Sequence, residues 1–302
     1  MITGVPAPIA LFAYNRLHHT RQTVEGLRAN DLAANSDLYV YCDGARNATA
    51  IAAVREVRDF LRTINGFKSV ALIERDSNLG LANSIITGVT EVCARHGRVI
   101  VMEDDLQTSP RFLQYMNGAL DLYADVPRVG SIHGYWYPVA QPCPKTFFLR
   151  GASCWGWATW SRAWNLFEPD GSKLLAQIER RKLVRAFDLD GAIRYTQMLR
   201  DQITGANDSW AIRWHATMFL ADRLQLSPGA SLVRNIGFDG SGTHCSESDA
   251  FATHLADSPV DLRPIPLEES VQARSALIRY YRRSRPTLAA RVVGRLRRVT
   301  GF

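Results

Sequence analysis

The chain has 302 residues, enough for one large α/β domain or two small ones, and its 46% hydrophobic and 10% aromatic content is ordinary for a folded protein. Its five cysteines are odd in number and form no CxxC pair, which argues against a disulfide framework and a structural zinc site and favours a reducing compartment. The net charge of +7 comes from residues 274–302, which hold nine arginines and no acid, so the rest of the surface is not basic.

Apolar runs alternate with amphipathic segments along the first half of the chain. Residues 1–16 lack the basic region and long apolar core of a signal peptide, and 7–16 instead predict a buried strand. Further strands are expected at 36–47, from Ser69 and at 98–105, with a helix after each of the first three strands. This order predicts an α/β fold with a mostly parallel sheet flanked by helices. The aromatic, loop-rich half from Gly130 should complete the same domain.

Polar side chains follow each of these four strands. They are Asn15 and Arg16, then Asp43, then Asp76 and Asn78, and finally Glu103, Asp104 and Asp105. The ligand crevice of an open α/β sheet lies beyond the carboxyl ends of its strands, so we expect one site there.

The three adjacent acids of 103–105 are the most informative motif. Without a partner they would repel and raise each other's pKa, and a divalent cation removes that conflict. Oxygen ligands suit Mg²⁺ or Mn²⁺, which usually take one or two carboxylates together with phosphate oxygens. The alternative is a helix N-terminus, because 105–123 predicts a helix, although Ser109-Pro110 would cap it without the acids.

The common phosphate-binding loops, GxxxxGK[ST] and GxGxxG, are absent, as are GxSxG and HExxH. A bound nucleotide would therefore depend on carboxylates, metal and arginine.

An ordered set of segments resembles the GT-A (Rossmann-like) glycosyltransferases of family 2. The segments are PIALFAYNR, YVYCDGAR, DSNLGLANSI, VIVMEDDLQTSPRFLQYM, FFLRGASCWGWATWSRAWNLFEP, NDSWAIRW and NIGFDGSGTHC, and together they span roughly 7–245. The Glu-Asp-Asp motif is similar to that of the N-acetylglucosaminyltransferase I family, and the chain also resembles bacterial proteins labelled hemolysin-like. The resemblance implies a GT-A domain over 1–270, with a nucleotide-binding half at 1–129, an acceptor-side half at 130–270 and a basic helical tail at 271–302.

The resemblance also implies roles for residues of the first half. Arg16 would lie near the nucleotide, and Asp43 would accept the uracil N–H, although Asp43-Gly44 is also an ordinary turn pair. Asn78 and Gly80 would line the donor pocket, although their turn is equally an ordinary strand–helix connection.

For the acids, the resemblance implies that Asp105 binds Mn²⁺ (or Mg²⁺) between the two phosphates of UDP. Asp104 would reach the ribose, and Glu103 the ribose or the donor sugar.

In the second half, the resemblance implies that Asp208 is the catalytic base. The family pattern has a second acid where Ser209 stands, but Asp208 is the only carboxylate in 202–221. The alternative is an N-cap for the following helix.

The segment CWGWATWSRAW is rich in tryptophan. Trp155 and Trp157 are expected to face the donor or acceptor sugar, whereas Trp160 and Trp164 are expected in the core. The glycine-rich stretch 237–245 is expected to be a loop that closes over the nucleotide, with His244 on a phosphate or the metal unless it is structural.

The tail predicts a basic amphipathic helix that begins at Pro286. Its apolar face would consist of Leu288, Val292, Leu296 and Val299. Such a helix is typical of an anionic membrane surface, and a solvated helix or a subunit contact is the alternative. Aromatic residues are not interleaved with the arginines beyond Tyr280 and Tyr281, so we expect no nucleic-acid partner.

Together with these features, the resemblance implies a metal-dependent, inverting transferase. It would move a sugar from UDP-GlcNAc or another UDP-hexose to a glycan or a lipid-linked glycan, such as a lipopolysaccharide or capsule precursor. It would be cytoplasmic and peripheral on the inner face of the membrane. A sugar nucleotidyltransferase usually carries a glycine-rich basic loop near its N-terminus, and it is disfavoured because 7–20 contains no glycine. A non-catalytic carbohydrate-binding protein is disfavoured because it would not explain why both Asp105 and Asp208 are present.

Overall fold

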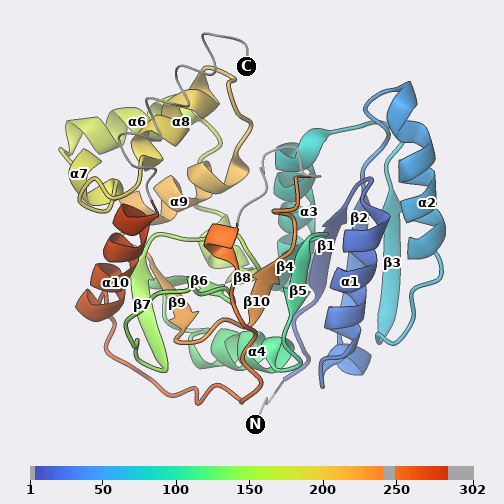
Figure 1. Ribbon diagram of the computed structural model, residues 1–302, viewed down its shortest axis with the longest axis horizontal. Coiled ribbons are helices and arrows are strands. Elements are labelled where there is room, and N and C mark those ends of the chain that lie inside the picture. The colour runs from blue at the N-terminus through green and yellow to red at the C-terminus, as the bar shows by residue number, and fades with distance from the viewer. Residues whose placement is uncertain (1–3, 241–248, 285–302) are drawn as a thin grey trace.

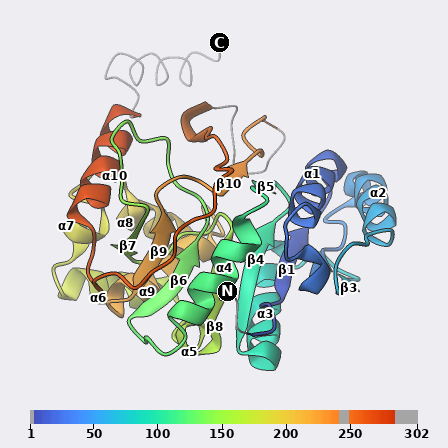
Figure 2. The ribbon, with the colours of Figure 1, turned by 90° about the horizontal axis from the view of Figure 1, so that it is seen from below.

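The computed structural model describes residues 4–240 and 249–284, and its centre is an eight-stranded sheet with helices on both faces (Figures 1 and 2). The strands of this sheet are β1 (Ile9–Ala13), β2 (Asp37–Cys42), β3 (Ser69–Glu74), β4 (Arg98–Glu103), β6 (Val129–His133), β7 (Thr146–Arg150), β8 (Trp157–Trp160) and β9 (Leu224–Pro228). A two-stranded sheet consists of β5 (Leu106–Thr108) and β10 (Val233–Asn235). The α/β fold with flanking helices is therefore confirmed.

The helices connect these strands. They are α1 (Leu17–Arg28), α2 (Ile51–Leu61), α3 (Gly80–His96), α4 (Phe112–Leu122), α5 (Ser161–Trp164), α6 (Gly171–Arg180), α7 (Val184–Phe187), α8 (Tyr195–Ile203), α9 (Trp210–Leu220) and α10 (Val271–Arg283).

The sheet order is β3-β2-β1-β4-β8-β6-β9-β7. Strands β3, β2, β1 and β4 pair in parallel, as the alternating order of strands and helices predicts. In the second half, β8 runs antiparallel to β4 and β6, and β7 runs antiparallel to β9. The carboxyl ends of the four parallel strands therefore meet at one edge.

The strands at the centre are apolar on both faces because helices cover both. In β1, Ile9 and Leu11 pack in the cluster that includes α1, α2 and α4, while Ala10 and Phe12 pack in the cluster that includes α3, α5 and α9. This separation follows from the two-residue period of a strand and explains why all of β1 is buried.

The segment after the acids differs from the prediction. Residues Leu106–Thr108 form β5 and not the start of a helix, because they pair antiparallel with β10. The helix α4 begins only at Phe112, and the hydroxyl of Ser109 accepts the N–H of Arg111 at 3.2 Å. The pairing partner of β5 is more than a hundred residues away, so the local pattern could not reveal it.

Helix α10 packs against the body of the protein. Its Ala273 and Leu277 are buried with Trp136 and Phe147, and Arg274 pairs with Asp190 at 2.7 Å. The predicted amphipathic helix from Pro286 onward lies outside the described residues. Within the described part of the chain, no helix has the length and apolar character needed to cross a membrane.

Candidate functional site

The acids lie at the carboxyl edge of the sheet, in the turn between β4 and β5. Glu103 is the last residue of β4, and Asp104 and Asp105 form the turn. Because β5 separates them from α4, they do not sit at the N-terminus of that helix. The alternative role as helix-terminal acids is therefore wrong, and the cluster needs another explanation.

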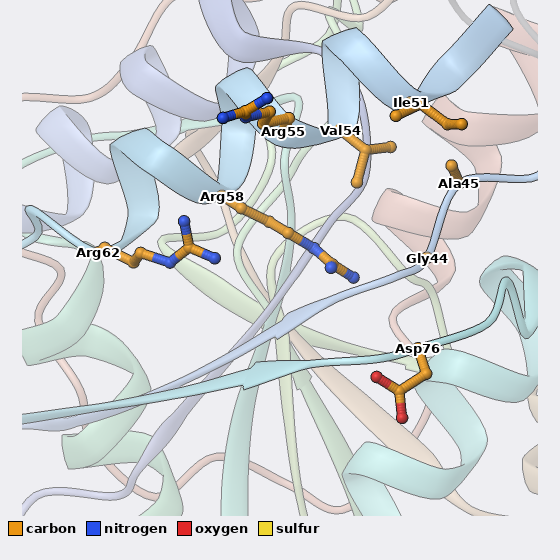
Figure 3. Close-up of a pocket in the computed structure, with 8 residues that line it drawn as sticks. All are labelled: Gly44, Ala45, Ile51, Val54, Arg55, Arg58, Arg62 and Asp76. Carbon is orange, nitrogen blue, oxygen red and sulfur yellow. The ribbon is translucent and has the colours of Figure 1, made fainter. Parts of the chain in front are cut away.

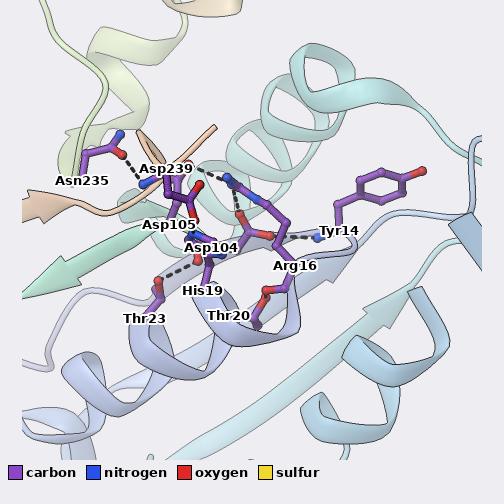
Figure 4. Close-up of polar contacts among 10 residues, drawn as sticks. Tyr14, Arg16, His19, Thr20, Thr23, Asp104, Asp105, Asn235 and Asp239 are labelled. Carbon is purple, nitrogen blue, oxygen red and sulfur yellow. Dashed lines mark hydrogen bonds and ion pairs between the residues drawn. The ribbon is translucent and has the colours of Figure 1, made fainter. Parts of the chain in front are cut away.

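Arg16, which follows β1, joins the two aspartates (Figure 4). Its Nη2 donates to Asp104 Oδ1 at 2.6 Å and to Asp105 Oδ2 at 2.8 Å. Asp104 also accepts the backbone N–H of Tyr14 at 3.3 Å, and its carbonyl accepts the hydroxyl of Thr23 at 2.8 Å. The resemblance implies that Arg16 lies near the nucleotide, and in the structure Arg16 is hydrogen-bonded to the acids.

The charges of this cluster are not balanced. Burial alone would lower the pKa of Arg16, but the two aspartates outweigh burial and raise that pKa. Burial and the neighbouring Asp105 and Asp104 raise the pKa of Glu103 well above its usual value, and burial raises that of Asp104 despite Arg16. One guanidinium therefore faces three carboxyl groups, and ionising all three together is unfavourable without a further cation.

The cluster fits a hard divalent cation, although its protein ligands would be few. The carboxylate of Glu103 has no hydrogen-bond partner within 4–240 and 249–284, and only Oδ2 of Asp105 bonds to Arg16. Among these residues no group of three or more His, Cys, Asp or Glu side chains is arranged to hold a metal. Sites for Mg²⁺-like ions commonly combine one or two carboxylates with substrate phosphates, which matches this donor set.

A segment that follows β10 covers the acids. The N–H of Ile236 donates to the carbonyl of Asp105 at 2.8 Å, and a Cβ added to Gly237 would lie 2.3 Å from Asp105 Oδ2. Asp239 pairs with His19 of α1 at 3.0 Å. Only glycine permits this close approach to the carboxylate. The contacts of Gly237, Asp239 and His19 were not predicted, and the glycine-rich composition of 237–245 was the only signal. His244 lies outside the described residues.

Asp43 holds the start of α3. Its carboxylate accepts the N–H of Leu79 at 2.9 and 3.0 Å and that of Gly80 at 3.0 Å. Asn78 donates to the carbonyl of Gly44 at 2.8 Å, and Gly80 adopts a φ of 74° that favours glycine. The structure thus brings the four predicted residues Asp43, Asn78, Gly80 and Arg16 to one edge of the sheet.

Asp208 reaches the same edge from the second half of the chain. Ser209 caps α9 by accepting the N–H of Ile212 at 3.2 Å, so Asp208 does not serve as the cap. Its carboxylate is 64% exposed, lies 3.6 Å from Arg213, and would be 3.9 Å from a Cβ placed on Gly80. An exposed carboxylate near the start of α3 is accessible to a substrate.

The two tryptophans expected to face a sugar have different environments. Trp157 is fully buried and stacks on Trp210 at 5.3 Å, so it belongs to the core and not to a sugar site. Trp155 is half-buried and contacts Tyr135, Phe238 and Phe251 edge-on. Trp160 and Trp164 are buried, as predicted.

Comparisons with known proteins give distant structural similarity. No protein-family model matches the chain. No curated protein matches it either. S. aureus TarS is similar over 48% of this chain, at 13% identity and a TM-score of 0.32, and the chain spans about a quarter (24%) of that protein. The mannosyltransferase PcManGT from Pyrobaculum calidifontis, solved with GDP-Man and Mn²⁺, is similar over 73% of this chain and 70% of its own, at 11% identity and a TM-score of 0.35.

Proposed function

We propose that the protein is a GT-A-type glycosyltransferase that moves a sugar from a nucleotide-sugar donor, UDP-GlcNAc or another UDP-hexose, to a hydroxyl of a glycan. The observation that carries the proposal is the cluster of Glu103, Asp104 and Asp105 at the carboxyl edge of parallel strands, where Arg16 pairs with the two aspartates and is the only guanidinium among three carboxyl groups. A cluster of this kind at this edge suits a metal-bound diphosphate.

Asp105 would hold Mn²⁺ or Mg²⁺ together with the donor phosphates. The bound ion would neutralise charge on the departing nucleoside diphosphate. Arg16 keeps the carboxylates of Asp104 and Asp105 side by side. Asp104 would reach the ribose, and Glu103 would reach the ribose or the donor sugar. His244 remains a proposed phosphate or metal contact.

Asp43 would bind the uracil. A carboxylate offers about four acceptor positions. Two backbone N–H groups, from Leu79 and Gly80, already donate to Asp43, and these contacts leave capacity for the N3–H of uracil. Asn78 and Gly80 would shape the wall of the same pocket.

Asp208 would act as the base. Its exposed carboxylate takes the proton of the acceptor hydroxyl while that oxygen forms a bond to the anomeric carbon and the bond to the diphosphate breaks. A single displacement of this kind inverts the configuration. Trp155, which is half-buried, would offer its ring to a sugar.

The acceptor would be a glycan or a lipid-linked glycan at an anionic membrane surface. Arg279, Arg282 and Arg283 of α10 are exposed and form no ion pair within the described residues, whereas Arg274 already pairs with Asp190 and Glu269. Each exposed arginine near an anionic leaflet would contribute about 1 kcal/mol to binding.

The test measures UDP release from a panel of UDP-sugars, with Mn²⁺ and with EDTA. We expect release from one donor that requires metal and is lost in Asp105→Ala, whereas Asp125→Ala, which changes an exposed aspartate after α4, keeps it. Saturable binding of a sugar, with no release of UDP in the presence of candidate glycan acceptors, would instead favour a carbohydrate-binding protein.

A further inference from the structure

A second concave feature lies between α2 and the ends of β2 and β3 (Figure 3). It is a pocket of about 310 Å³. Its lining consists of Gly44, Ala45, Ile51, Val54, Arg55, Arg58, Arg62 and Asp76. None of the three acids of the candidate site lines it, and neither does Arg16, so it is a separate pocket.

Helix α2 gives this pocket its positive charge. Arg55, Arg58 and Arg62 are three and four residues apart, and this spacing puts their side chains on one face of the helix. Figure 3 shows that all three side chains extend from α2 and that Asp76 lies on the segment opposite this helix. The three arginines therefore face a single carboxylate within the lining.

The guanidinium groups of the three arginines differ in how many of their N–H groups already have hydrogen-bond or ion-pair partners. Arg62 is fully engaged, because it forms two hydrogen bonds to Glu74 at 2.8 Å and pairs with Asp59. Arg58 donates to the carbonyls of Arg75 and Asp43 at 2.5 and 3.4 Å, and its Nη1 lies 3.7 Å from Glu74.

Two donor groups remain available. Arg55 is exposed without a hydrogen bond or ion pair in the part of the chain that the structure describes, and Nη1 of Arg58 has only its 3.7 Å contact with Glu74. These two groups leave positive potential at this wall.

We propose that this pocket binds the phosphate group of a small hydroxylated molecule. The planar donors of Arg55 and Arg58 match phosphate oxygens in geometry as well as charge. The volume exceeds that of a bare phosphate and lies at the lower end of the range for small-molecule pockets. Asp76 would accept hydroxyl donors from the rest of the ligand and would repel a second anionic group.

The ends of β2 and β3 separate this pocket from the acids. Arg58 holds the carbonyls of Asp43 and Arg75 at these two ends, so the pocket lies behind the segment that carries Asp43. A ligand here would occupy a different position from a nucleotide at the acid cluster.

Titration calorimetry of the whole protein tests the proposal, with EDTA present and with ionic strength held constant by NaCl. The probes are inorganic phosphate and glycerol 3-phosphate. Arg55→Gln should weaken saturable binding about fivefold, the effect of losing one partly exposed charge pair. Arg95→Gln, which changes an exposed arginine of α3 that pairs with Glu91, is the matched control and should bind like the wild type.

Binding of inorganic phosphate would identify the free ion as sufficient, whereas binding of glycerol 3-phosphate alone would show that the hydroxylated part is needed. The proposal is overturned if neither probe saturates, or if Arg55→Gln and Arg95→Gln behave alike. In a separate titration without EDTA, UDP with Mn²⁺ should not displace the bound probe, and competition would show that the pocket belongs to the nucleotide site. Unchanged circular dichroism of Arg55→Gln would show that the exposed substitution leaves the fold intact.

Discussion

Replacement of Asp43 by alanine should destabilise the protein, because its carboxylate caps a helix that belongs to another segment of the chain. Asp43 is 5% exposed, and it accepts the N–H groups of Leu79 and Gly80 at the first turn of α3. The substitution Asp43→Ala leaves both donors without this acceptor and removes a negative charge from the positive end of the helix dipole.

The magnitude follows from these contacts. Hydrogen bonds to a charged group contribute about 1.5–3 kcal/mol each, and loss of a capping side chain costs about 0.5–2 kcal/mol. Leu79 is exposed and Gly80 is half-buried, so water can replace part of the lost interaction. We therefore expect Asp43→Ala to lower the free energy of unfolding by about 2 kcal/mol. Asp43→Asn, which keeps one acceptor oxygen, should lower it by about half as much.

Urea unfolding followed by tryptophan fluorescence and circular dichroism measures this effect. With an m-value of about 3 kcal/mol/M, Asp43→Ala should lower the midpoint by about 0.7 M at an unchanged slope. Asp76→Ala is the matched control, because Asp76 follows the neighbouring strand, is exposed, and makes no hydrogen bond or ion pair within the described residues. Equal midpoints for Asp43→Ala and Asp76→Ala would refute the capping role.

Three further outcomes are expected. In Gly237→Ala the new Cβ would lie 2.3 Å from Asp105 Oδ2 and would displace this carboxylate. The affinity for UDP in the presence of Mn²⁺, measured by calorimetry, should therefore fall at least about tenfold. An unchanged affinity would contradict the close approach of Gly237 to Asp105. Asp208→Asn should reduce kcat for transfer by a factor of about 10²–10⁴. The urea midpoint should stay unchanged because the side chain is 64% exposed, and a lower midpoint would point to a structural role for Asp208. Burial lowers the pKa of His133 to about 3 and that of His215 to about 4, so the unfolded chain binds protons more readily below pH 6.5. The free energy of unfolding should therefore fall by up to about 1.4 kcal/mol per pH unit for each histidine between pH 6.5 and 5, and His133→Gln should reduce this slope in urea titrations at several pH values.

The fold of the first half could be predicted because its signals are local. The apolar run that forms β1 and the polar residue at the end of each strand can both be recognised in the sequence. The division of Ile9 and Leu11 from Phe12 between two faces then follows from strand geometry. Because parallel strands have their carboxyl ends at the same edge of the sheet, Arg16, Asp43 and Asp105 are expected at one edge.

Other predictions needed contacts between distant segments. Residues Leu106–Thr108 carry a helical pattern locally but pair with β10, and this pairing separates the acids from α4. Trp157 and Trp155 look alike in the sequence, yet the first is enclosed by α9 and the second is half-buried beside Phe238.

The sequence by itself determined which side chains stand at the ends of the strands, because the apolar runs and their alternation with helical segments are properties of neighbouring residues. Only the tertiary structure decided what those side chains contact. Arg16 spans Asp104 and Asp105, Asp43 caps α3, and the backbone at Gly237 covers Asp105, and each contact joins segments whose separation along the chain leaves no periodic signal.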